Sequence, residues 1–478
     1  MCIRDSPNKD QAYFGDGIAE EILNTLAKLQ DIKVAGRTSS FSFKDSTIAN
    51  IGTKLNVNHV LEGSVQKNDK KVRVTAQLIK VSDGFQVWSD KYDRELDDIL
   101  AIQDELAQNI GTVLLEKLAP EQKAKLSTLA PITGEVYDLF LRGKHVHKNL
   151  YKSSRSLDDF RNSEQLFFKA IALDSTYGLA HAGLADLYDS YWVQLQQQEG
   201  NSDRMKYGEL MNQESKLALQ LAPENAYVNQ VRGYVLHHLG DTEAAFRHFL
   251  KSYRISPNNP ESLMGLANLY LGMGLYDDAL QFAEKAMNID PLFSSAWTLQ
   301  IYGNFYLSRW EKTIKVCQSF LDINPANQTA LEYMFRSYFH LNEREKALEI
   351  LQKIKGVETL GLDVEIALLK ENKAYIDEIL LLNNPNLNFI IHAYQGAKEK
   401  AQNAYQLASM DYLNYAKSQS EILNSFYLDN LHNRKLKDFQ ELDWFKEVME
   451  FEKGKYDYLT SRYPEAAVLL ETRDKKIK

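Results

Sequence analysis

Cysteine, proline and long apolar runs are all scarce in this chain of 478 residues. The two cysteines, Cys2 and Cys317, are far apart, and two such residues provide neither a disulfide framework nor a zinc knuckle. The longest apolar stretches, such as residues 379–382, are much shorter than the roughly 20 residues that cross a bilayer. We therefore expect no disulfide framework, no metal site of that kind and no membrane-spanning helix in this sequence.

Positive charge is also in deficit, because 56 Lys and Arg residues face 65 Asp and Glu residues, for a net charge of -9. Nucleic-acid binding depends on clustered cations that replace counterions at the phosphates, and the basic run at residues 473–478 is short and terminal. We expect no nucleic-acid binding. With 44% hydrophobic and 25% charged residues, the composition is otherwise that of a globular protein.

The few prolines are placed regularly: Pro223, Pro257, Pro291 and Pro325 are separated by 34 residues each. A proline cannot continue a helix, so this spacing predicts helix ends that recur at the same interval. The repeat that ends at Pro291 has three large residues and one alanine on its first helix, glycine at its turn and alanines on its second helix: Leu263, Leu266, Ala267, Tyr270, Gly274, Ala279, Ala283 and Ala286. This 34-residue pattern resembles the tetratricopeptide repeat, in which small residues let two helices cross closely and the turn accepts positive φ.

The pattern continues when it is shifted by 34 residues in either direction. It then includes Cys317, which we expect to be a buried packing residue rather than a reactive thiol. Two irregular hairpins precede the regular ones, the first over residues 136–174 with an enlarged connection, the second lengthened by an insertion at 191–210. Helical spacing persists at 364–382 and 390–410, and residues 413–478 are expected to be C-terminal capping helices.

Residues before the repeats mix helical and strand patterns. We predict helices at 17–29, 48–55 and 99–118, a short apolar strand at 32–35, and three consecutive strands at 59–66, 71–80 and 85–88. The connections between the last three strands are short and turn-prone, which is typical of antiparallel hairpins. The fold class is therefore α+β, with a small α/β N-terminal domain followed by an all-α tetratricopeptide superhelix.

Several sequence blocks in this N-terminal part resemble the TolB-like N-terminal domain. They include Phe14-Gly-Asp-Gly-Ile-Ala-Glu-Glu-Ile22, Arg37-Thr-Ser-Ser-Phe41, Val60-Leu-Glu-Gly-Ser-Val65, Trp88-Ser-Asp-Lys-Tyr-Asp-Arg94 and Ile102-Gln-Asp-Glu105. The resemblance implies a bacterial protein in which this domain precedes tetratricopeptide repeats, as in regulators associated with adenylate or guanylate cyclases and in transcriptional regulators. The corresponding domains are a TolB-like domain at 7–120, a linker at 121–135, repeats at 136–412 and caps at 413–478.

One departure from the TolB-like pattern concerns its first strand. The family opens with an apolar strand, whereas residues 1–6 here resemble a non-native head, so we expect the true N-terminus and that strand to be missing. A sheet without that strand exposes an edge and favours self-association, which makes a homo-oligomer one expected assembly. The resemblance also places an output domain upstream, and it leaves the location open between a cytoplasmic and a periplasmic part of an inner-membrane protein.

Candidate catalytic residues are few. Asp16, Glu20 and Glu21 could share a helix face as an acid/base or metal site, but Asp16 is also placed to cap a helix that starts near Gly17, and we favour capping. The histidine pairs 145/147 and 237/238 lack the spacing of a helical zinc site. We expect no enzyme activity, no cofactor and no metal.

The tetratricopeptide resemblance implies a concave groove lined by first-helix positions 2, 5, 9, 12 and 13. The candidate groove residues are Tyr227, Tyr234, His237, Tyr302, Phe305, Tyr306, Arg336 and Phe339. Aromatic rings with polar tips suit the capture of a protein or peptide. The alternative is that these rings only pack between repeats.

Function is therefore predicted to be non-catalytic: an interaction scaffold in signal transduction, which binds a protein or peptide and is coupled to an upstream output domain. The alternatives are the regulatory half of a class III adenylate or guanylate cyclase, or of a transcriptional regulator.

Overall fold

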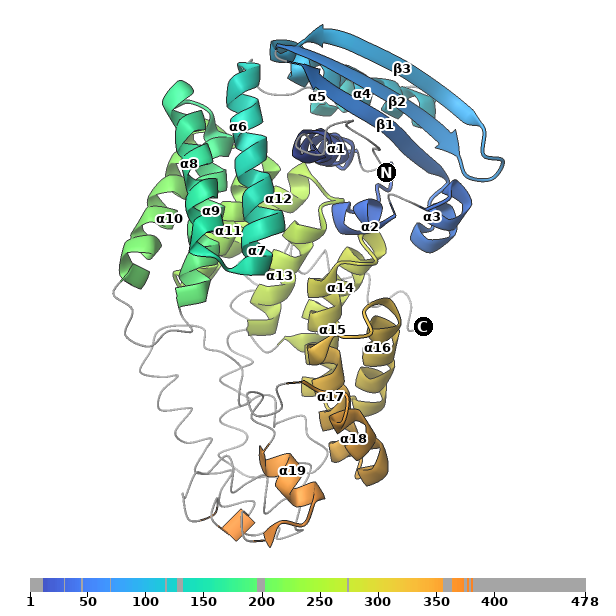
Figure 1. Cartoon of the computed structure of the whole chain (residues 1–478), viewed down its shortest axis with the longest axis vertical. Coiled ribbons are helices and arrows are strands. Elements are labelled where there is room, and N and C mark those ends of the chain that lie inside the picture. Colours follow the sequence, from blue (N-terminus) through green and yellow to red (C-terminus); the bar gives the residue numbers. More distant parts are fainter. Residues whose placement is uncertain are drawn as a thin grey trace. The chain divides into compact units, whose positions relative to one another are not determined.

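The computed structural model describes residues 12–29, 31–43, 46–68, 70–116, 118–126, 132–195, 203–272, 275–355, 363–373, 376–377 and 380. They form a mainly helical chain with one small antiparallel sheet near the N-terminus (Figure 1), as predicted. The chain divides into two compact units, the first made of residues 1–265 and 285–293, and the second of residues 266–284 and 294–478.

The sheet has the strand order β1 (His59–Asn68), β2 (Lys71–Lys80) and β3 (Gln86–Glu95), and both neighbouring pairs are antiparallel. Alternate residues of β2 are buried, which is the pattern of a sheet with one covered face. Helix α1 (Ala12–Leu26) lies between the sheet and α6 (Gly134–His145), and α4 (Ile99–Leu115) packs against β3 (Figure 1).

Most of the predicted N-terminal elements are present. Helix α3 (Ile48–Leu55) has the predicted bounds, and the three strands follow in the predicted order, with β3 extending beyond residue 88. A helix α5 (Pro120–Leu126) lies where the linker was predicted, while residues 127–131 are outside the described part. The predicted head at residues 1–6 and the question of a first strand also fall outside the described residues.

Two predictions in this region are wrong. Residues 32–35 form no strand, because the neighbouring backbone bonds to the helix pairs instead of to a sheet: Asn258 Nδ2 donates to Leu29 O (3.1 Å) and Ile32 O (3.0 Å). Asp16 does not cap a helix, because α1 begins four residues before it, at Ala12. The short helix α2 (Arg37–Ser42) was not predicted.

Helices then follow in consecutive pairs. In the first unit these are α6 with α8 (Leu157–Leu173), joined through the π-helix η3 (Val146–Tyr151) and α7 (Lys152–Ser154), then α9 (Gly178–Leu195) with α10 (Asp203–Leu221), and α11 (Ala226–His238) with α12 (Thr242–Ile255). In the second unit they are α15 (Ser294–Tyr306) with α16 (Trp310–Ile323), and α17 (Gln328–His340) with α18 (Arg344–Leu351). The helices α13 (Pro260–Gly272) and α14 (Tyr276–Ile289) contain the boundaries between the units.

The 34-residue proline period is confirmed. Each of Pro223, Pro257, Pro291 and Pro325 comes two residues after the end of a helix, namely α10, α12, α14 and α16. The turn within a pair recurs at the same interval: Gly240, Ser308 and Asn342 have φ values of 87°, 53° and 60°. The equivalent Gly274 lies outside the described residues.

Packing explains why small residues recur. The buried Phe249 ring lies between Gly233 and Gly265, where an added Cβ would come within 2.7 and 2.3 Å of the ring. Cys317 is fully buried as predicted, and burial raises the pKa of its thiol to about 12.

The predicted insertion lengthens α9 and α10 to 18 and 19 residues, whereas the α11 and α12 helices have 13 and 14. The polar run at residues 196–200 within this insertion lies outside the described residues. Further along, α19 (Asp363–Leu369) occupies part of the predicted helical stretch 364–382, and the stretches 390–410 and 413–478 are outside the described part. Among the described helices, none combines the length and the apolar character needed to cross a bilayer.

Candidate functional site

Contacts between glycines and a buried phenylalanine show how the two irregular helix pairs align with the positions of the regular repeats. An added Cβ at Gly143 or Gly183 would come within 2.8 or 2.4 Å of the Phe167 ring, as at Gly233 and Gly265 around Phe249. Gly143 on α6 is therefore equivalent to Gly233 on α11. This equivalence shows which residues of the earlier pairs share the first-helix positions 9, 12 and 13 with Tyr234, His237 and His238.

We call one set of side chains the groove face. It consists of the residues at these positions in the first three pairs, together with Tyr227 at position 2 of α11. Besides the α11 residues, they are Lys144, His147 and Lys148 on α6 and η3, and Asp186, Asp189 and Ser190 on α9. The sequence did not assign these six residues to repeat positions, because the enlarged connections interrupt the 34-residue interval upstream of Pro223. The glycines at 143 and 183 were the available signal.

Hydrogen bonds confirm that the groove face is contiguous in the first unit. Tyr227 donates its hydroxyl hydrogen to Asp186 Oδ2 (3.1 Å), which connects α11 to α9. His147 Nε2 lies 2.9 Å from Ser190 Oγ, connecting η3 to α9. These bonds join side chains from three consecutive pairs into one polar network, in which Lys144, His147 and Asp189 are buried.

The electrostatic environment differs between histidines on this face. Burial lowers the pKa of His147 to about 3 and that of His237 to about 4, so both rings are neutral near pH 7. His238 behaves oppositely: burial alone would lower its pKa, but the hydrogen bond from Nδ1 to Asp189 Oδ1 (2.7 Å) and the aspartate charge raise it. The acid Asp186 is held ionised, because the charges of Lys152 and Lys148 and the hydrogen bond from Tyr227 contribute to lowering its pKa to about 2 despite burial.

The predicted groove residues of the first unit are partly engaged. Tyr234 donates to the Glu261 carbonyl (3.3 Å), and its ring meets Phe249 edge-on at 4.9 Å between centroids. His237 keeps a buried Nδ1 with no hydrogen-bond partner among the described protein atoms. Tyr227, Tyr234 and His237 are all half-buried.

Those of the second unit form a separate aromatic group. Tyr302, Phe305 and Tyr306 are half-buried and surround Tyr333, with centroid distances to it of 4.8 Å from Tyr302 and 4.9 Å from Phe305. Phe305 also meets His340 at 5.6 Å. The three predicted rings are therefore brought together, although they contact neighbouring helices as well.

Two predicted residues of the second unit offer less to a ligand. Arg336 forms ion pairs with Glu332 (3.0 Å) and Glu365 (2.7 Å), so its guanidinium is already engaged. Phe339 is only 5% exposed and belongs to the hydrophobic core. For these two residues the contacts favour the packing alternative, while binding at the other predicted groove residues stays a prediction.

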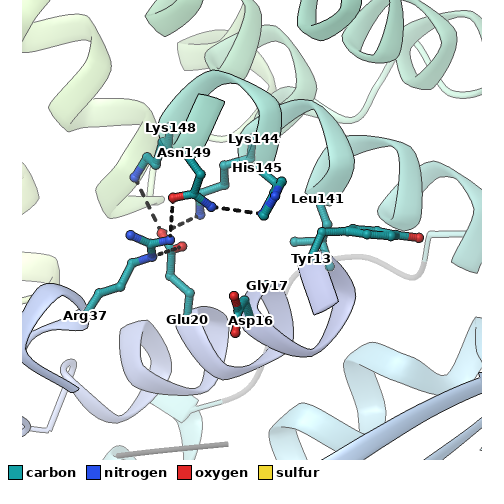
Figure 2. A pocket seen from close by; sticks show the side chains of 10 residues that line it. All are labelled: Tyr13, Asp16, Gly17, Glu20, Arg37, Leu141, Lys144, His145, Lys148 and Asn149. Carbon is teal, nitrogen blue, oxygen red and sulfur yellow. Dashed lines mark hydrogen bonds and ion pairs between the residues drawn. The ribbon is translucent and has the colours of Figure 1, made fainter. Parts of the chain in front are cut away.

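A charged cluster lies between α1 and the first pair, where it lines a small pocket (Figure 2). Glu20 forms ion pairs with Arg37 Nε (2.8 Å), Lys144 Nζ (3.1 Å) and Lys148 Nζ (3.5 Å), and Glu21 with Lys144 (2.8 Å). Burial would raise the pKa of Glu20, but these cations lower it below its usual range. The cluster is thus a set of satisfied ion pairs rather than an acid/base pair. Across the described residues, no group of three or more His, Cys, Asp or Glu side chains could hold a metal ion.

A second contact joins the N-terminal part to the turn that follows α14, still within the first unit. The N-cap residue of α2 is Gly36, which has no side chain to cap it, and Asp290 supplies the missing acceptor. Its carboxylate accepts from Thr38 N (3.0 Å), Ser39 N (2.8 Å) and the Ser39 hydroxyl. A Cβ at Gly36 would come within 2.4 Å of Asp290, so glycine permits the approach.

Comparison with known proteins gives matches to the repeats. Residues 236–300 match the tetratricopeptide repeat family. The chain is 32% identical over 182 residues to the putative adenylate cyclase 3 of Rhizobium meliloti strain 1021, covering 38% of this chain and 30% of that protein. It is 24% identical over 123 residues to the Hsp70-Hsp90 organizing protein 2 of Arabidopsis thaliana, covering 26% and 22%. The matches therefore span less than a third of these relatives' lengths.

Among solved structures, PilF of Pseudomonas aeruginosa is 17% identical, with 49% of this chain and 99% of that chain covered and a TM-score of 0.37. The family match and the helix pairs at a 34-residue interval together show that this chain contains tetratricopeptide repeats.

Proposed function

We propose that this chain is a non-catalytic interaction module, in which the helix pairs bind a protein or peptide partner along first-helix positions. Two observations carry the proposal: the groove face, where charged, aromatic and hydroxyl side chains from three consecutive pairs form one polar network, and the half-buried rings of Tyr302, Phe305 and Tyr306 in the second unit. Half-buried tyrosines such as Tyr227 and Tyr234 suit this role, because they offer a large contact area at low entropic cost.

We further propose that the N-terminal part is a TolB-like domain coupled to an upstream output domain. The sheet with its flanking helices is compatible with the resemblance of the sequence blocks. The relative named putative adenylate cyclase 3 favours a cyclase as the output, so the regulatory half of a nucleotide cyclase is the second candidate function. A transcriptional regulator remains the alternative suggested by the sequence.

Partner binding is tested first by capture and then by titration. The tagged chain and its Tyr302→Ala/Phe305→Ala variant are used to capture proteins from a bacterial lysate, and the protein recovered by the parent alone is purified and titrated against both. We expect the double variant to weaken binding by about 2–4 kcal/mol if the rings are buried anchors. The matched control, Glu311→Ala/Lys315→Ala, changes exposed residues of the second helix α16 and should bind like the parent.

Equal affinity of the parent and the aromatic double variant would contradict binding at these positions. Loss of helicity in the double variant would show instead that Tyr302 and Phe305 belong to the core. The enzyme alternative has its own test: the purified chain, incubated with ATP or GTP and magnesium or manganese, should release no cyclic nucleotide. Measurable product would contradict the non-catalytic assignment.

A further inference from the structure

The first pair of the groove face is already occupied. Lys144 and Lys148, at positions 9 and 13, both point to Glu20 on α1 (Figure 2), and Lys144 also pairs with Glu21. The Lys144 side chain retains only 8% of its exposure. A ligand approaching the groove face at this end therefore meets α1 before it meets these two cations.

The same cations connect α1 to the third pair. Lys144 Nζ lies 5.3 Å from the centroid of the Tyr227 ring, and Lys148 Nζ lies 5.8 Å from it, within the range of cation–π attraction. Tyr227 in turn donates to Asp186 on α9. The acidic pair of α1 is thus bound to a network that includes groove-face residues from three pairs.

Helix α1 has a separate stripe for this contact. Phe14, Ile18 and Ile22 are fully buried in the hydrophobic core of the first unit, which includes residues of the sheet strands and of the helix pairs. Tyr13, Gly17 and the Glu20–Glu21 pair, spaced by three to four residues, instead meet α6. Tyr13 donates to Asp138 (2.8 Å). At Gly17 an added Cβ would come within 2.9 Å of Leu141, so the glycine allows the two helices to approach.

The backbone of the first pair is adapted at this point. Lys148 and Asn149 lie on the π-helix η3, a conformation that is frequent at functional sites. Asn149 Oδ1 accepts from the Arg37 guanidinium (3.1 Å), so η3 contacts α2 as well as α1. The widened turn thus presents a cation and an amide together towards the acidic side of α1.

We propose that α1 is an internal ligand of the groove face: its adjacent carboxylates fill the first pair, and an external partner reaches that pair only by displacing α1 with an acidic segment of its own. This inference rests on the proposed function, because it assigns the regulation of the same face. A partner without adjacent carboxylates binds from α9 onward and leaves α1 in place. A partner that carries them couples its binding to movement of the N-terminal α/β part.

The test uses the full chain and a synthetic probe, a fluorescein-labelled peptide with the sequence of residues 12–26. The variant Glu20→Lys/Glu21→Lys places positive charges beside Lys144 and Lys148 and should release α1 from the first pair. Fluorescence anisotropy should show the probe binding this variant at least tenfold more tightly than the parent. A probe with both glutamates replaced by glutamine should lose that gain.

Two controls separate the inference from a folding defect. Glu345→Lys/Glu349→Lys makes the same charge change on exposed residues of α18 and should behave like the parent. Adding Lys144→Glu and Lys148→Glu to the first variant restores the ion pairs with reversed signs, and should abolish probe binding. If Glu20→Lys/Glu21→Lys does not fold, Glu20→Gln/Glu21→Gln replaces it in the same comparison.

Equal probe binding by parent and variant, or binding by neither while circular dichroism shows both folded, would overturn the internal-ligand proposal. Either result leaves the capture experiment with the Tyr302 and Phe305 variant unaffected, because that experiment changes other helices and uses another binding partner. Failure of the capture experiment, in turn, does not alter the anisotropy measurement.

Discussion

The cap that Asp290 provides for α2 gives the sharpest stability prediction. Helix α2 has only six residues and no side-chain cap of its own, so it depends on this distant carboxylate. Asp290→Ala removes the acceptor for Thr38 N, Ser39 N and the Ser39 hydroxyl. The Ser39 side chain is fully buried, which means that water does not replace the lost acceptor without local opening.

The expected cost follows from two contributions. Removing an N-cap acceptor costs about 0.5–2 kcal/mol, and leaving a buried donor unsatisfied costs about 1–3 kcal/mol. Because these contributions overlap, we expect the free energy of opening α2 to fall by about 2–4 kcal/mol. At 1.36 kcal/mol for each factor of ten, this corresponds to amide exchange that is roughly 30- to 900-fold faster.

Hydrogen–deuterium exchange measured by mass spectrometry, on peptides that span α2, provides the assay. Asn324→Ala is the matched control, since it changes the same repeat position one interval later, where the side chain is exposed. Asp290→Asn keeps an acceptor oxygen but loses the charge, and should be intermediate. Exchange of α2 in Asp290→Ala within threefold of the parent would refute the reasoning, and would mean that apolar packing alone holds α2 in place.

Further predictions concern the turns and the buried histidines. Gly240→Ala forces a side chain into the left-handed region at φ 87° and should lower the free energy of unfolding by about 1–2 kcal/mol. Ser308→Gly removes a side chain from that region, at φ 53°, and should raise the free energy of unfolding. Urea titration of each variant measures both changes, and a stabilised Gly240→Ala would contradict the turn assignment. Since His147 and His237 have folded pKa values of about 3 and about 4, below the usual 6.5, the unfolded chain takes up protons first as the pH falls. Stability should therefore be complete above pH 6.5 and decrease towards pH 4 by up to about 1.4 kcal/mol per pH unit for each histidine. His147→Gln should flatten this dependence in urea midpoints measured across that range, and an unchanged slope would assign the acid sensitivity to other groups.

The N-terminal part contacts the helix pairs directly, so a partner that binds the helix pairs could affect it without an intervening linker. The Glu20 cluster and the Asp290 cap are two of its contacts that reach the helix pairs directly rather than through the segment between α5 and α6. A partner that perturbs either contact acts on the α/β part without a linker as intermediary. This arrangement is compatible with the proposed coupling between partner binding and the N-terminal part.

Local sequence patterns determined much of this protein. Proline cannot continue a helix, so the interval between Pro223, Pro257, Pro291 and Pro325 fixed where four helices end. Strand-like runs with short, turn-prone connections predicted the hairpins of the sheet, and the repeat pattern predicted the buried Cys317. These features depend on neighbours in the chain, or on neighbours one repeat away, and are therefore visible in the sequence.

The tertiary structure decided what depends on partners distant in sequence. The cap of α2 comes from Asp290, and residues 32–35 lie in no strand because Asn258 and the helix pairs satisfy the backbone around them. Glu20 and Glu21 read as acids near a helix start, and only the packed position of α1 shows that both meet Lys144 on α6. The sequence gives the charge and hydrogen-bonding capacity of each side chain. A buried polar group needs a partner, and the packing of the helices determines which partner lies within bonding distance.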